Sequence, residues 1–255
     1  MKTALTIAGS DPTGGAGLQA DLTMFKARGI NGVSIVSVIT AQNTEGVYTI
    51  YELPAGALSS QMTTLLNDIK PDALKTGMLY TADNVKIISE NIQAYSLKNL
   101  VIDPVSVSST GVSLADAGMI EALKRHLLPL SRVITPNIIE AEALSGIDIH
   151  NNKDVKEAAV RLRSLGPDSV IITGGHMKGN AVDLLFDGEE FMSLENDKID
   201  GEFHGTGCAF SAAITACLAL GYSVKESFIE AKDIVYKAMQ SAKSPGSGLK
   251  ILNIE

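Results

Sequence analysis

A regular alternation of short apolar runs with helical patterns is the feature that most constrains the fold of this 255-residue chain. Such alternation is typical of an α/β fold with a mainly parallel sheet. The predicted strands are Thr3–Ala8, Val33–Thr40, Ala73–Thr76, Leu100–Asp103, Arg132–Thr135, Val170–Thr173, and Ala181–Phe186 with Glu190–Leu194, a pair joined by an Asp187-Gly188 hairpin turn. The predicted helices run from about Gly17 to Arg28, from Pro54 to before Pro71, onward from Thr81, from about Ala115 to Leu128, from Asn152 as the N-cap to Gly166, from Thr206 to Leu220, and from Val224 to about Ala242.

No low-complexity linker, charge block or Pro/Ser-rich run divides the chain, so we expect residues 1–255 to form a single domain. The formal net charge of −8 argues against nucleic acid or an anionic membrane as the main partner. No apolar stretch reaches transmembrane length, and no signal peptide precedes the first predicted strand. Cys208 and Cys217 would lie about 13 Å apart along one helix, on opposite sides, so they cannot form a disulfide with each other. We therefore expect a cytoplasmic protein.

Polar residues and glycines follow the predicted strands at their carboxyl ends. They are Gly9-Ser10-Asp11, Gln42-Asn43, Gly77-Met78, Asp103, Asn137 and Gly174-Gly175-His176. In open α/β sheets, ligands bind outside the carboxyl ends of the strands. The sequence therefore predicts that these loops build one binding site.

The segment from Gly205 to Cys208 has the features of an anion site. Gly205 and Gly207 flank Thr206, and a helix of small residues follows at once. Glycine allows close approach of a ligand, and a helix N-terminus offers free N–H groups together with about half a positive charge. Because the thiol of Cys208 sits at the mouth of this site, the pattern suggests phosphoryl transfer.

Asp103 ends a wholly apolar strand, and a buried carboxylate needs a backbone partner or a nearby cation. Asn137 and Glu140 fall on one face of a short helix. Together with Asp103 they could hold Mg²⁺ through water molecules, because this cation keeps most of its hydration shell. The alternative is that Glu140 is an exposed helix acid.

Other motifs in the chain are weak or absent. The string Gly15–Ala20 matches G-x-G-x-x-A, but it starts too far beyond the strand, and no acid follows the second strand to bind a ribose. We therefore do not expect dinucleotide binding, and no P-loop or zinc signature occurs. His126 and His150 are expected to be solvated, whereas His176 and His204 would have either a phosphate-binding or a structural hydrogen-bonding role.

An ordered set of strings carries a family resemblance. They are Leu5–Asp11, Gly14–Asp21, Ala41–Thr44, Lys75–Leu79, Ile102–Val105, Thr135–Glu142 and His204–Cys208. In this order, over about residues 3–215, they resemble the hydroxymethylpyrimidine (phosphate) kinase branch of the ribokinase superfamily. The resemblance implies a ribokinase-like fold, with a mainly parallel central sheet flanked by helices on both faces. It also implies a homodimeric enzyme that uses ATP and Mg²⁺.

The resemblance further implies roles for individual residues. Gln42 would hydrogen-bond the aminopyrimidine edge, since an amide matches a neighbouring donor and acceptor. The rest of the pyrimidine pocket would be lined by Gly9, Ala16, Asp21, Met78 and Val105. The nucleotide side would comprise Asn137, Thr173 and Thr206, with Asp103 and Glu140 on the Mg²⁺. Gly205, Gly207 and Cys208 would form the catalytic anion hole, with Cys208 where most of the superfamily carries an aspartate base.

The chain also departs from the family pattern. The loop after Asp-Pro-Val, Ser106–Gly111, contains no lysine, and Thr173 stands where a lysine usually precedes Gly-Gly-His. Lys178 or a residue of another chain could replace these cations. The usual histidine-containing C-terminal tail is also absent.

The resulting hypothesis is an ATP-dependent kinase that phosphorylates 4-amino-5-hydroxymethyl-2-methylpyrimidine and then its monophosphate in thiamine biosynthesis. Pyridoxal or pyridoxine kinase is the first alternative, because those substrates are also flat rings with a CH₂OH group, and the amide of Gln42 favours the aminopyrimidine. A non-catalytic module that binds thiamine precursors is the second. The presence of Asp103, Glu140 and Cys208 argues against it, since simple binding would not need them.

Overall fold

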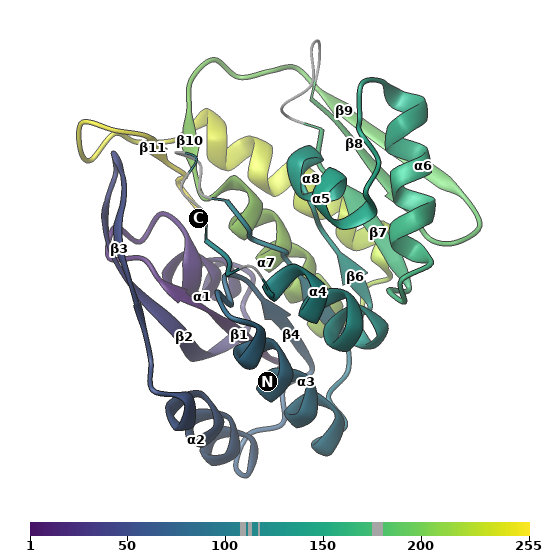
Figure 1. The fold of residues 1–255 in the computed structure, drawn as a ribbon. Helices are drawn as coiled ribbons and strands as arrows, with labels where there is room; N and C mark the ends of the chain where they lie inside the picture. Colours follow the sequence, from purple (N-terminus) through teal and green to yellow (C-terminus); the bar gives the residue numbers. More distant parts are fainter. Residues whose placement is uncertain (108–110, 112–113, 117, 175–180) are drawn as a thin grey trace.

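The computed structural model describes residues 1–107, 111, 114–116, 118–174 and 181–255. Their main strands are β1 (Thr3–Ser10), β2 (Asn31–Asn43), β3 (Gly46–Glu52), β4 (Ala73–Thr76), β5 (Leu100–Ile102), β6 (Val133–Ile134), β7 (Ser169–Ile172), β8 (Ala181–Phe186) and β9 (Phe191–Asn196). These strands form one sheet in the order β3-β2-β1-β4-β5-β6-β7-β8-β9 (Figure 1). The pairs from β2 to β7 are parallel, whereas β3 at one edge and β8 and β9 at the other pair antiparallel. The predicted α/β class is confirmed.

Helices cover both faces of this sheet (Figure 1). They are α1 (Gly17–Ala27), α2 (Ala55–Leu66), α3 (Ala82–Ala94), α4 (Met119–Ala122), α5 (Ile138–Ser145), α6 (Asn152–Arg163), α7 (Thr206–Leu220) and α8 (Val224–Gln240). The apolar cluster on one face includes residues of α2 to α6, and the cluster on the other includes residues of α1, α7 and α8. No helix among the described residues is long and apolar enough to cross a membrane.

The strands alternate their side chains between these two clusters, as the period of two requires. On β1, Leu5 and Ile7 enter the cluster under α2–α6, and Ala4 enters the other. Helix α7 is buried continuously from Ala209 to Ala219 because it packs against the sheet, α1 and α8. The many small residues of α7 allow the helix to approach the sheet closely. This packing places the start of α7 at the carboxyl ends of the strands.

Several boundaries differ from the sequence predictions. Strand β3 was not predicted, because a β-bulge interrupts its alternation: Val47 and Ile50 pack against the same small apolar cluster although they are three residues apart, and Tyr48 and Tyr51 are exposed. The helix predicted from Ala115 begins only at Met119, since Ala115 forms a β-bridge with Tyr80. It then continues as a π turn over Leu123–Leu127 and a 3₁₀ turn over Leu128–Leu130.

The predicted bounds of α7 are confirmed at both ends. Gly205 precedes the helix at φ 80° and Gly221 follows it at φ 95°, both in the left-handed region that favours glycine. The N-cap of α6 is Asn151, one residue earlier than predicted, and its side chain accepts hydrogen bonds from Lys153 N–H and Asp154 N–H.

A small parallel sheet joins the entrance of α7 to the C-terminal segment. Its strands are β10 (Phe203–His204) and β11 (Lys250–Ile251), with His204 paired to Ile251. The residues before β11 lie against the turn between β2 and β3, where Leu249 N–H donates to Thr44 O at 2.8 Å. The C-terminal segment therefore contacts both the β2–β3 hairpin and the strand that leads to the predicted anion site.

Phe228 on α8 offers a test of how much packing holds α7 in place. Its ring is fully buried and meets Phe210 of α7 edge-on, with 6.3 Å between ring centroids. Phe228→Ala should lower the free energy of unfolding by about 3–5 kcal/mol, because it leaves a cavity in the core. The neighbouring Ile229→Ala, at a position 44% exposed, should cost less than about 1 kcal/mol. Urea unfolding followed by circular dichroism measures both, and equal losses would contradict this account.

Candidate active site

A cavity of about 870 Å³ opens at the carboxyl ends of the parallel strands. Each of these strands supplies lining residues at or just beyond its end, including Ser10, Met78, Asp103, Thr135 and Thr173. This is the edge where an open α/β sheet binds its ligands. The predicted convergence of the loops on one site is therefore observed.

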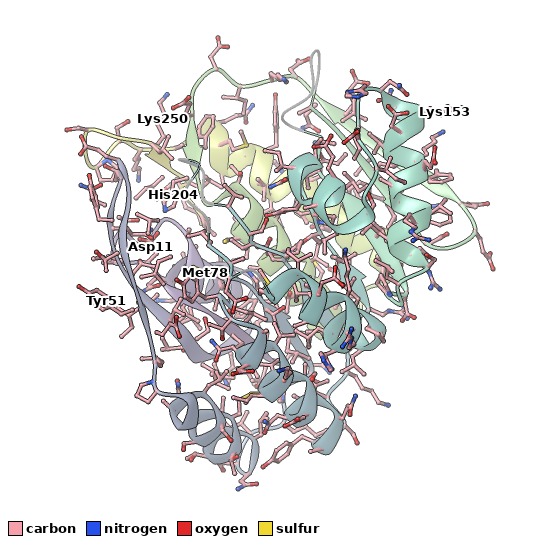
Figure 2. All side chains as sticks on the ribbon, viewed as in Figure 1. Asp11, Tyr51, Met78, Lys153, His204 and Lys250 are labelled. Carbon is pink, nitrogen blue, oxygen red and sulfur yellow. The ribbon has the colours of Figure 1, made fainter. Side chains whose placement is uncertain are left out.

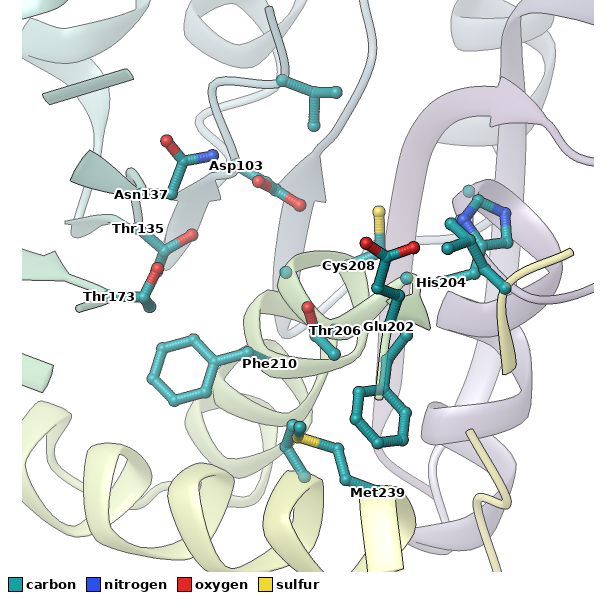
Figure 3. A pocket seen from close by; sticks show the side chains of 18 of the residues that line it. Asp103, Thr135, Asn137, Thr173, Glu202, His204, Thr206, Cys208, Phe210 and Met239 are labelled. Atoms are coloured by element: carbon teal, nitrogen blue, oxygen red, sulfur yellow. The ribbon is translucent and has the colours of Figure 1, made fainter. Parts of the chain in front are cut away.

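Among the predicted site residues, all except Asp21 line this cavity. Those that do are Gly9, Ala16, Gln42, Met78, Asp103, Val105, Asn137, Glu140, Thr173, Gly205, Thr206, Gly207 and Cys208. Figure 3 shows Asp103, Thr135, Asn137 and Thr173 on one side of the start of α7 and His204 on the other. Cys208 and Thr206 lie between them, so α7 begins in the middle of the site.

The turn that opens α7 depends on glycine at position 205. With φ at 80°, Gly205 lies so close to Gly15 that a Cβ there would collide with the Gly15 carbonyl oxygen. The first α-helical bond runs from Ala209 N–H to Gly205 O at 2.9 Å. The N–H groups of Thr206, Gly207 and Cys208 therefore have no carbonyl within the helix to bond, and all three residues line the cavity. This is the arrangement that binds phosphate.

The carboxylate of Asp11 holds the facing glycine-rich loop in shape. It accepts hydrogen bonds from Thr13 N–H (2.8 Å), Thr13 Oγ1 (2.9 Å) and Ala16 N–H (2.9 Å). Burial alone would raise the pKa of Asp11, but the bonds from His204 and Thr13 lower it below its usual range. This anchoring role was not predicted from the sequence, although the acid directly after a strand marked the position.

Asp21 requires a correction. It was predicted to line the pyrimidine pocket, but its carboxylate is fully buried, 2.8 Å from Lys75 Nζ and 2.6 Å from Thr6 Oγ1. Helix α1 turns this side chain towards the sheet rather than towards the cavity, because Asp21 neutralises the buried lysine of β4. Asp21 therefore has a structural role as the ion-pair partner of Lys75.

Lys75 was not predicted as part of the site. Its ammonium is 0% exposed and lies 3.7 Å from Asp103 Oδ2 in addition to its contact with Asp21. Burial alone would lower the pKa of Lys75, but Asp21, Cys208 and Asp103 raise it above its usual range. A lysine inside an otherwise apolar predicted strand was the only signal for it in the sequence.

Cys208 lies on the first turn of α7, where Gly17 N–H bonds its sulfur. Burial and the negative charge of Asp103 raise the pKa of the thiol to about 12, although Lys75 and the Gly17 N–H act in the opposite direction. The thiol is therefore protonated at neutral pH in the free protein. A helix N-terminus lowers the pKa of a thiol, whereas burial and nearby negative charge raise it. At Cys208 the raising effects are larger, so the group is a thiol rather than a thiolate.

Asp103 and Glu140 form an acidic pair at the cavity wall. Glu140 is 6% exposed, so the alternative that it is an exposed helix acid is wrong. Its carboxylate accepts the Asn137 N–H at 2.9 Å, and the Asn137 side chain accepts the Glu140 N–H at 2.9 Å, which closes a capping box on α5. Burial and the nearby Asp103 carboxylate raise the pKa of Glu140 to about 8.

The donor set of this pair fits Mg²⁺. Two carboxylates that repel each other gain from a divalent cation between them, and Mg²⁺ takes one or two carboxylates together with water and phosphate oxygens. Within the described ranges, no group of three or more His, Cys, Asp or Glu side chains gathers as a complete metal site. Two carboxylates would leave the remaining positions of the coordination shell to water and phosphate oxygens.

A further part of the cavity wall is built by elements that the sequence did not mark. It is lined by residues 196–199 and 201–202 and by the α8 residues Lys232, Val235, Tyr236 and Met239. Lys232 Nζ lies 2.7 Å from Asp183 Oδ2, and Asp183 Oδ1 accepts the Gly174 N–H at 2.9 Å. This buried pair fixes the chain just after Thr173. The predicted positions Gly175, His176 and Lys178, and residues 108–110 of the Ser106–Gly111 loop, lie outside the described residues.

The fold and the site together define a phosphotransferase of ribokinase-like fold. Its sheet order, its helix N-terminus facing a large cavity, and its acidic pair suit the binding and transfer of a phosphoryl group. The profile of the phosphomethylpyrimidine kinase family matches residues 11–253, and the chain belongs to this family.

Individual relatives agree with this assignment. A hydroxymethylpyrimidine/phosphomethylpyrimidine kinase of Bacillus subtilis is 42% identical over 248 residues, which cover 96% of this chain and 92% of the relative. A pyridoxine kinase of the same organism is 42% identical over 250 residues, covering 95% and 92%. The solved ADP complex of Bacillus subtilis pyridoxal kinase superposes with a TM-score of 0.92 at 38% identity, covering 100% of this chain and 97% of that one.

The raised pKa of Cys208 has a measurable consequence. Because only the thiolate reacts with iodoacetamide, the alkylation rate should rise about tenfold per pH unit from pH 7 to pH 10, without a plateau. Mass spectrometry of a Cys217→Ala variant isolates the reaction of Cys208, since the other cysteine of the chain is removed. A plateau below pH 8 would show a stabilised thiolate and contradict the assignment.

Proposed function

We propose that this protein transfers the γ-phosphoryl group of ATP to the hydroxymethyl oxygen of 4-amino-5-hydroxymethyl-2-methylpyrimidine and then phosphorylates the monophosphate, in thiamine biosynthesis. The observation that carries the proposal is that Gln42 and the Gly205–Cys208 turn line one cavity. A ring held at Gln42 can therefore present its CH₂OH group to the anion site. The names of the relatives support this substrate class.

The ring side of the cavity suits a flat heteroaromatic compound. Met78 and Val105 supply apolar surface, and Gly9 lets Met78 pack closely on β1, because a Cβ there would lie 3.1 Å from Val38 Cγ2 and 3.3 Å from the Met78 sulfur. Gln42 offers a donor and an acceptor on one side chain, which complements a ring nitrogen beside an exocyclic amine. The combination of apolar walls and one amide is typical of a small-molecule site.

The chemistry is an in-line transfer. The hydroxymethyl oxygen forms a bond to the γ-phosphorus, the bond to the bridging oxygen of ADP breaks, and the hydroxyl proton is released. Such transfers pass through a loose transition state, so positioning and charge neutralisation matter most. The N–H groups of residues 206–208 would hold the transferred group. Asp103 and Glu140 would bind Mg²⁺, which offsets phosphate charge when it is bound.

Cys208 would act on the hydroxymethyl group rather than on phosphate. Its thiol is protonated in the free site, so it does not provide a preformed thiolate. In a loose transition state the attacking oxygen keeps its proton until late in the transfer. Cys208 would therefore position this oxygen as a neutral thiol, and the hydroxyl proton would pass to a phosphate oxygen or to solvent as the new P–O bond forms.

The nucleotide is proposed to occupy the part of the cavity between Thr173 and helix α8. Thr173, Thr206 and Asn137 would face its phosphates, and the apolar side chains of Val235 and Met239 suit a purine ring. Lys232 is already neutralised by Asp183 at 2.7 Å, so it does not simply replace the family's missing lysines. The helix N-terminus and Mg²⁺ would carry more of the phosphate charge in this chain.

Phosphorylation of pyridoxine or pyridoxal is the second candidate. One observation favours it: a relative named pyridoxine kinase is as similar to this chain as one named for the pyrimidine, at 42% identity each. Both substrates are flat rings with a CH₂OH group. The non-catalytic binding module is disfavoured, because the acidic pair and Cys208 all line the cavity.

We also propose a single-domain, cytoplasmic homodimer. Tyr48 and Tyr51 on the edge strand β3 are 67% and 56% exposed, and Ile39 on β2 is 45% exposed. Large apolar side chains on an edge strand favour association with another protein surface. A second copy of the chain is the simplest partner for this patch.

Release of ADP from ATP and Mg²⁺ with each ring compound tests the function. We expect kcat/KM to be highest with the hydroxymethylpyrimidine and about tenfold lower with pyridoxine, since Gln42 matches only the first. Preferred turnover of pyridoxine or pyridoxal would establish the second candidate instead. Tight binding of the pyrimidine without ADP release would establish a binding module.

The anion turn has a matched control at the other end of its own helix. Gly205→Ala should lower kcat about a hundredfold, because the new methyl group collides with Gly15 and displaces the donors of the turn. Gly221→Ala imposes similar backbone strain at φ 95° but meets no atom within 4 Å and lies away from the cavity. It should destabilise the protein without changing kcat by more than about twofold. Equal kcat values for the two variants would refute a role of the turn in transfer.

A further inference from the structure

Helix α7 carries two buried hydroxyl groups in an otherwise apolar stretch. The helix begins at the cavity, three of whose lining residues, Asp11, Met78 and His204, are labelled in Figure 2. Ser211 and Thr215 lie further into the core, about one turn apart; both are 0% exposed, and neither lines the cavity. A buried hydroxyl is costly unless it is hydrogen-bonded, so the partner of each one indicates its role.

The hydroxyl of Thr215 makes a bond that is ordinary for a buried helical threonine. Its Oγ1 donates to Ser211 O, one turn earlier on the same helix, at 2.7 Å. This bond stays within α7. Thr215 is therefore satisfied without any contact to the cavity, and it provides the comparison for Ser211.

The hydroxyl of Ser211 has one proton and three acceptors within reach. Its Oγ lies 3.0 Å from Gly207 O, 3.1 Å from Cys208 O and 3.0 Å from Asp103 Oδ2. In an α-helix the two carbonyls already accept the N–H groups four residues later. The carboxylate oxygen has no other donor among the described residues, because Lys75 Nζ, at 3.7 Å, is beyond hydrogen-bond distance.

The proton of Ser211 therefore belongs to the bond with Asp103. A carboxylate only accepts hydrogen bonds, and a bond to a charged acceptor is stronger than a bond to a neutral carbonyl. If the hydroxyl donated along its own helix instead, two oxygens 3.0 Å apart would face each other without a proton between them. Unlike the bond of Thr215, this one joins α7 to the end of β5.

This bond fixes the direction of the Asp103 carboxylate. Oδ2 is turned towards Ser211 and Lys75, whereas Oδ1 accepts no hydrogen bond from any described residue. The side chain is 5% exposed and lines the cavity, and Figure 3 shows it on one side of the start of α7. Oδ1 is therefore the oxygen that remains for a ligand.

Glu140, the other acid of the pair, is oriented in a similar way. The Asn137 N–H donates to its Oε2 at 2.9 Å. Each acid of the pair therefore has one oxygen bonded to the protein. For Glu140 the donor is a backbone group, and for Asp103 it is the side chain of Ser211.

We propose that Ser211 is a positioning residue that holds Oδ2 of Asp103 and thereby presents Oδ1 to a divalent cation in the cavity. This role rests on the proposed function, in which Asp103 and Glu140 bind Mg²⁺. Ser211 itself lies outside the cavity lining and acts through Asp103 alone. Partners that orient a ligating carboxylate typically weaken metal affinity by about 10–100-fold when they are removed.

The same hydroxyl relates the cation to the anion turn. Ser211 lies one turn after Gly207 and Cys208, whose N–H groups would hold the transferred phosphoryl group. Because Ser211 also holds Asp103, a shift of the start of α7 would move the cation ligand with it. The cation and the phosphoryl group would therefore keep a constant separation.

Binding of Mn²⁺ tests this role without any ring compound. Mn²⁺ suits the same carboxylate and water ligands as Mg²⁺, and its relaxation of water protons is enhanced when a protein holds it. With ADP present, Ser211→Ala should raise the Kd for Mn²⁺ about tenfold. Thr215→Val, the matched control, removes the other buried hydroxyl of α7 at nearly constant shape and should leave the Kd within about twofold.

The outcomes distinguish the role of Ser211 from the proposed function. If the unaltered protein and Ser211→Ala bind Mn²⁺ equally well, Ser211 has no positioning role, while the proposed reaction stands. If Ser211→Ala and Thr215→Val weaken binding alike, the serine is merely structural and the proposal is wrong. If the unaltered protein shows no enhancement, the acidic pair holds no cation, and the role of Ser211 falls together with the metal part of the proposed function.

Steady-state kinetics give the corresponding split between constants. Ser211→Ala should raise the Mg²⁺ concentration for half-maximal rate about tenfold, with KM for the hydroxymethylpyrimidine within about twofold. Ser211→Thr keeps the hydroxyl and should restore the Mg²⁺ dependence to within about threefold. Loss of kcat and of every constant alike in both variants would contradict a positioning role. If the pyrimidine is not turned over, the Mn²⁺ titration decides.

Discussion

The ammonium of Lys75 is the interaction on which the site depends. It is fully buried between Asp21 of α1, at 2.8 Å, and Asp103 after β5, at 3.7 Å, and its charge also acts on Cys208 at the start of α7. Asp103 in turn accepts a hydrogen bond from Ser211 of α7 at 3.0 Å. Removal of one member of such a group leaves an unpaired buried charge, which costs several kcal/mol. One cation therefore links two helices to the carboxyl ends of two strands, and the turn proposed to bind phosphate begins one of these helices.

This arrangement separates two tasks within one cavity. The proposed phosphate side is made largely of backbone N–H groups and a glycine contact, which would not depend on the ring that enters. The proposed ring side would be determined by a few side chains, Gln42 above all. Relatives named for a pyrimidine and for pyridoxine can therefore be equally similar to this chain, since the shared part of the molecule serves transfer and only a small part selects the ring.

The sequence predicted best what the backbone determines. The limits of α7 followed from Gly205 and Gly221, and the lining loops followed from the rule that ligands bind at the carboxyl ends of strands. The failures concern side-chain direction and distant pairing. Asp21 was assigned to the pocket because its string matched the family, but one sequence does not say which face of α1 meets the sheet. Asp103 was expected to need a backbone partner or a cation. The cation, Lys75, was missed because it lies 28 residues earlier in the chain, in a short strand whose pattern otherwise indicates only core packing. Strand β3 was not predicted, because burial along this strand does not alternate from one residue to the next.

The C-terminal segment around residues 249–251 connects two parts of the proposed ring side of the cavity. Ile251 pairs with His204, and Leu249 bonds to Thr44 in the hairpin that carries Gln42. Insertion of residues or cleavage of the chain near position 250 would therefore change the substrate selectivity of the protein as well as its solubility. By contrast, Met1 is 97% exposed, and it precedes the beginning of β1, whose other end, at Ser10, lines the cavity. Affinity tags and surface-immobilisation linkers for this enzyme belong at the amino terminus.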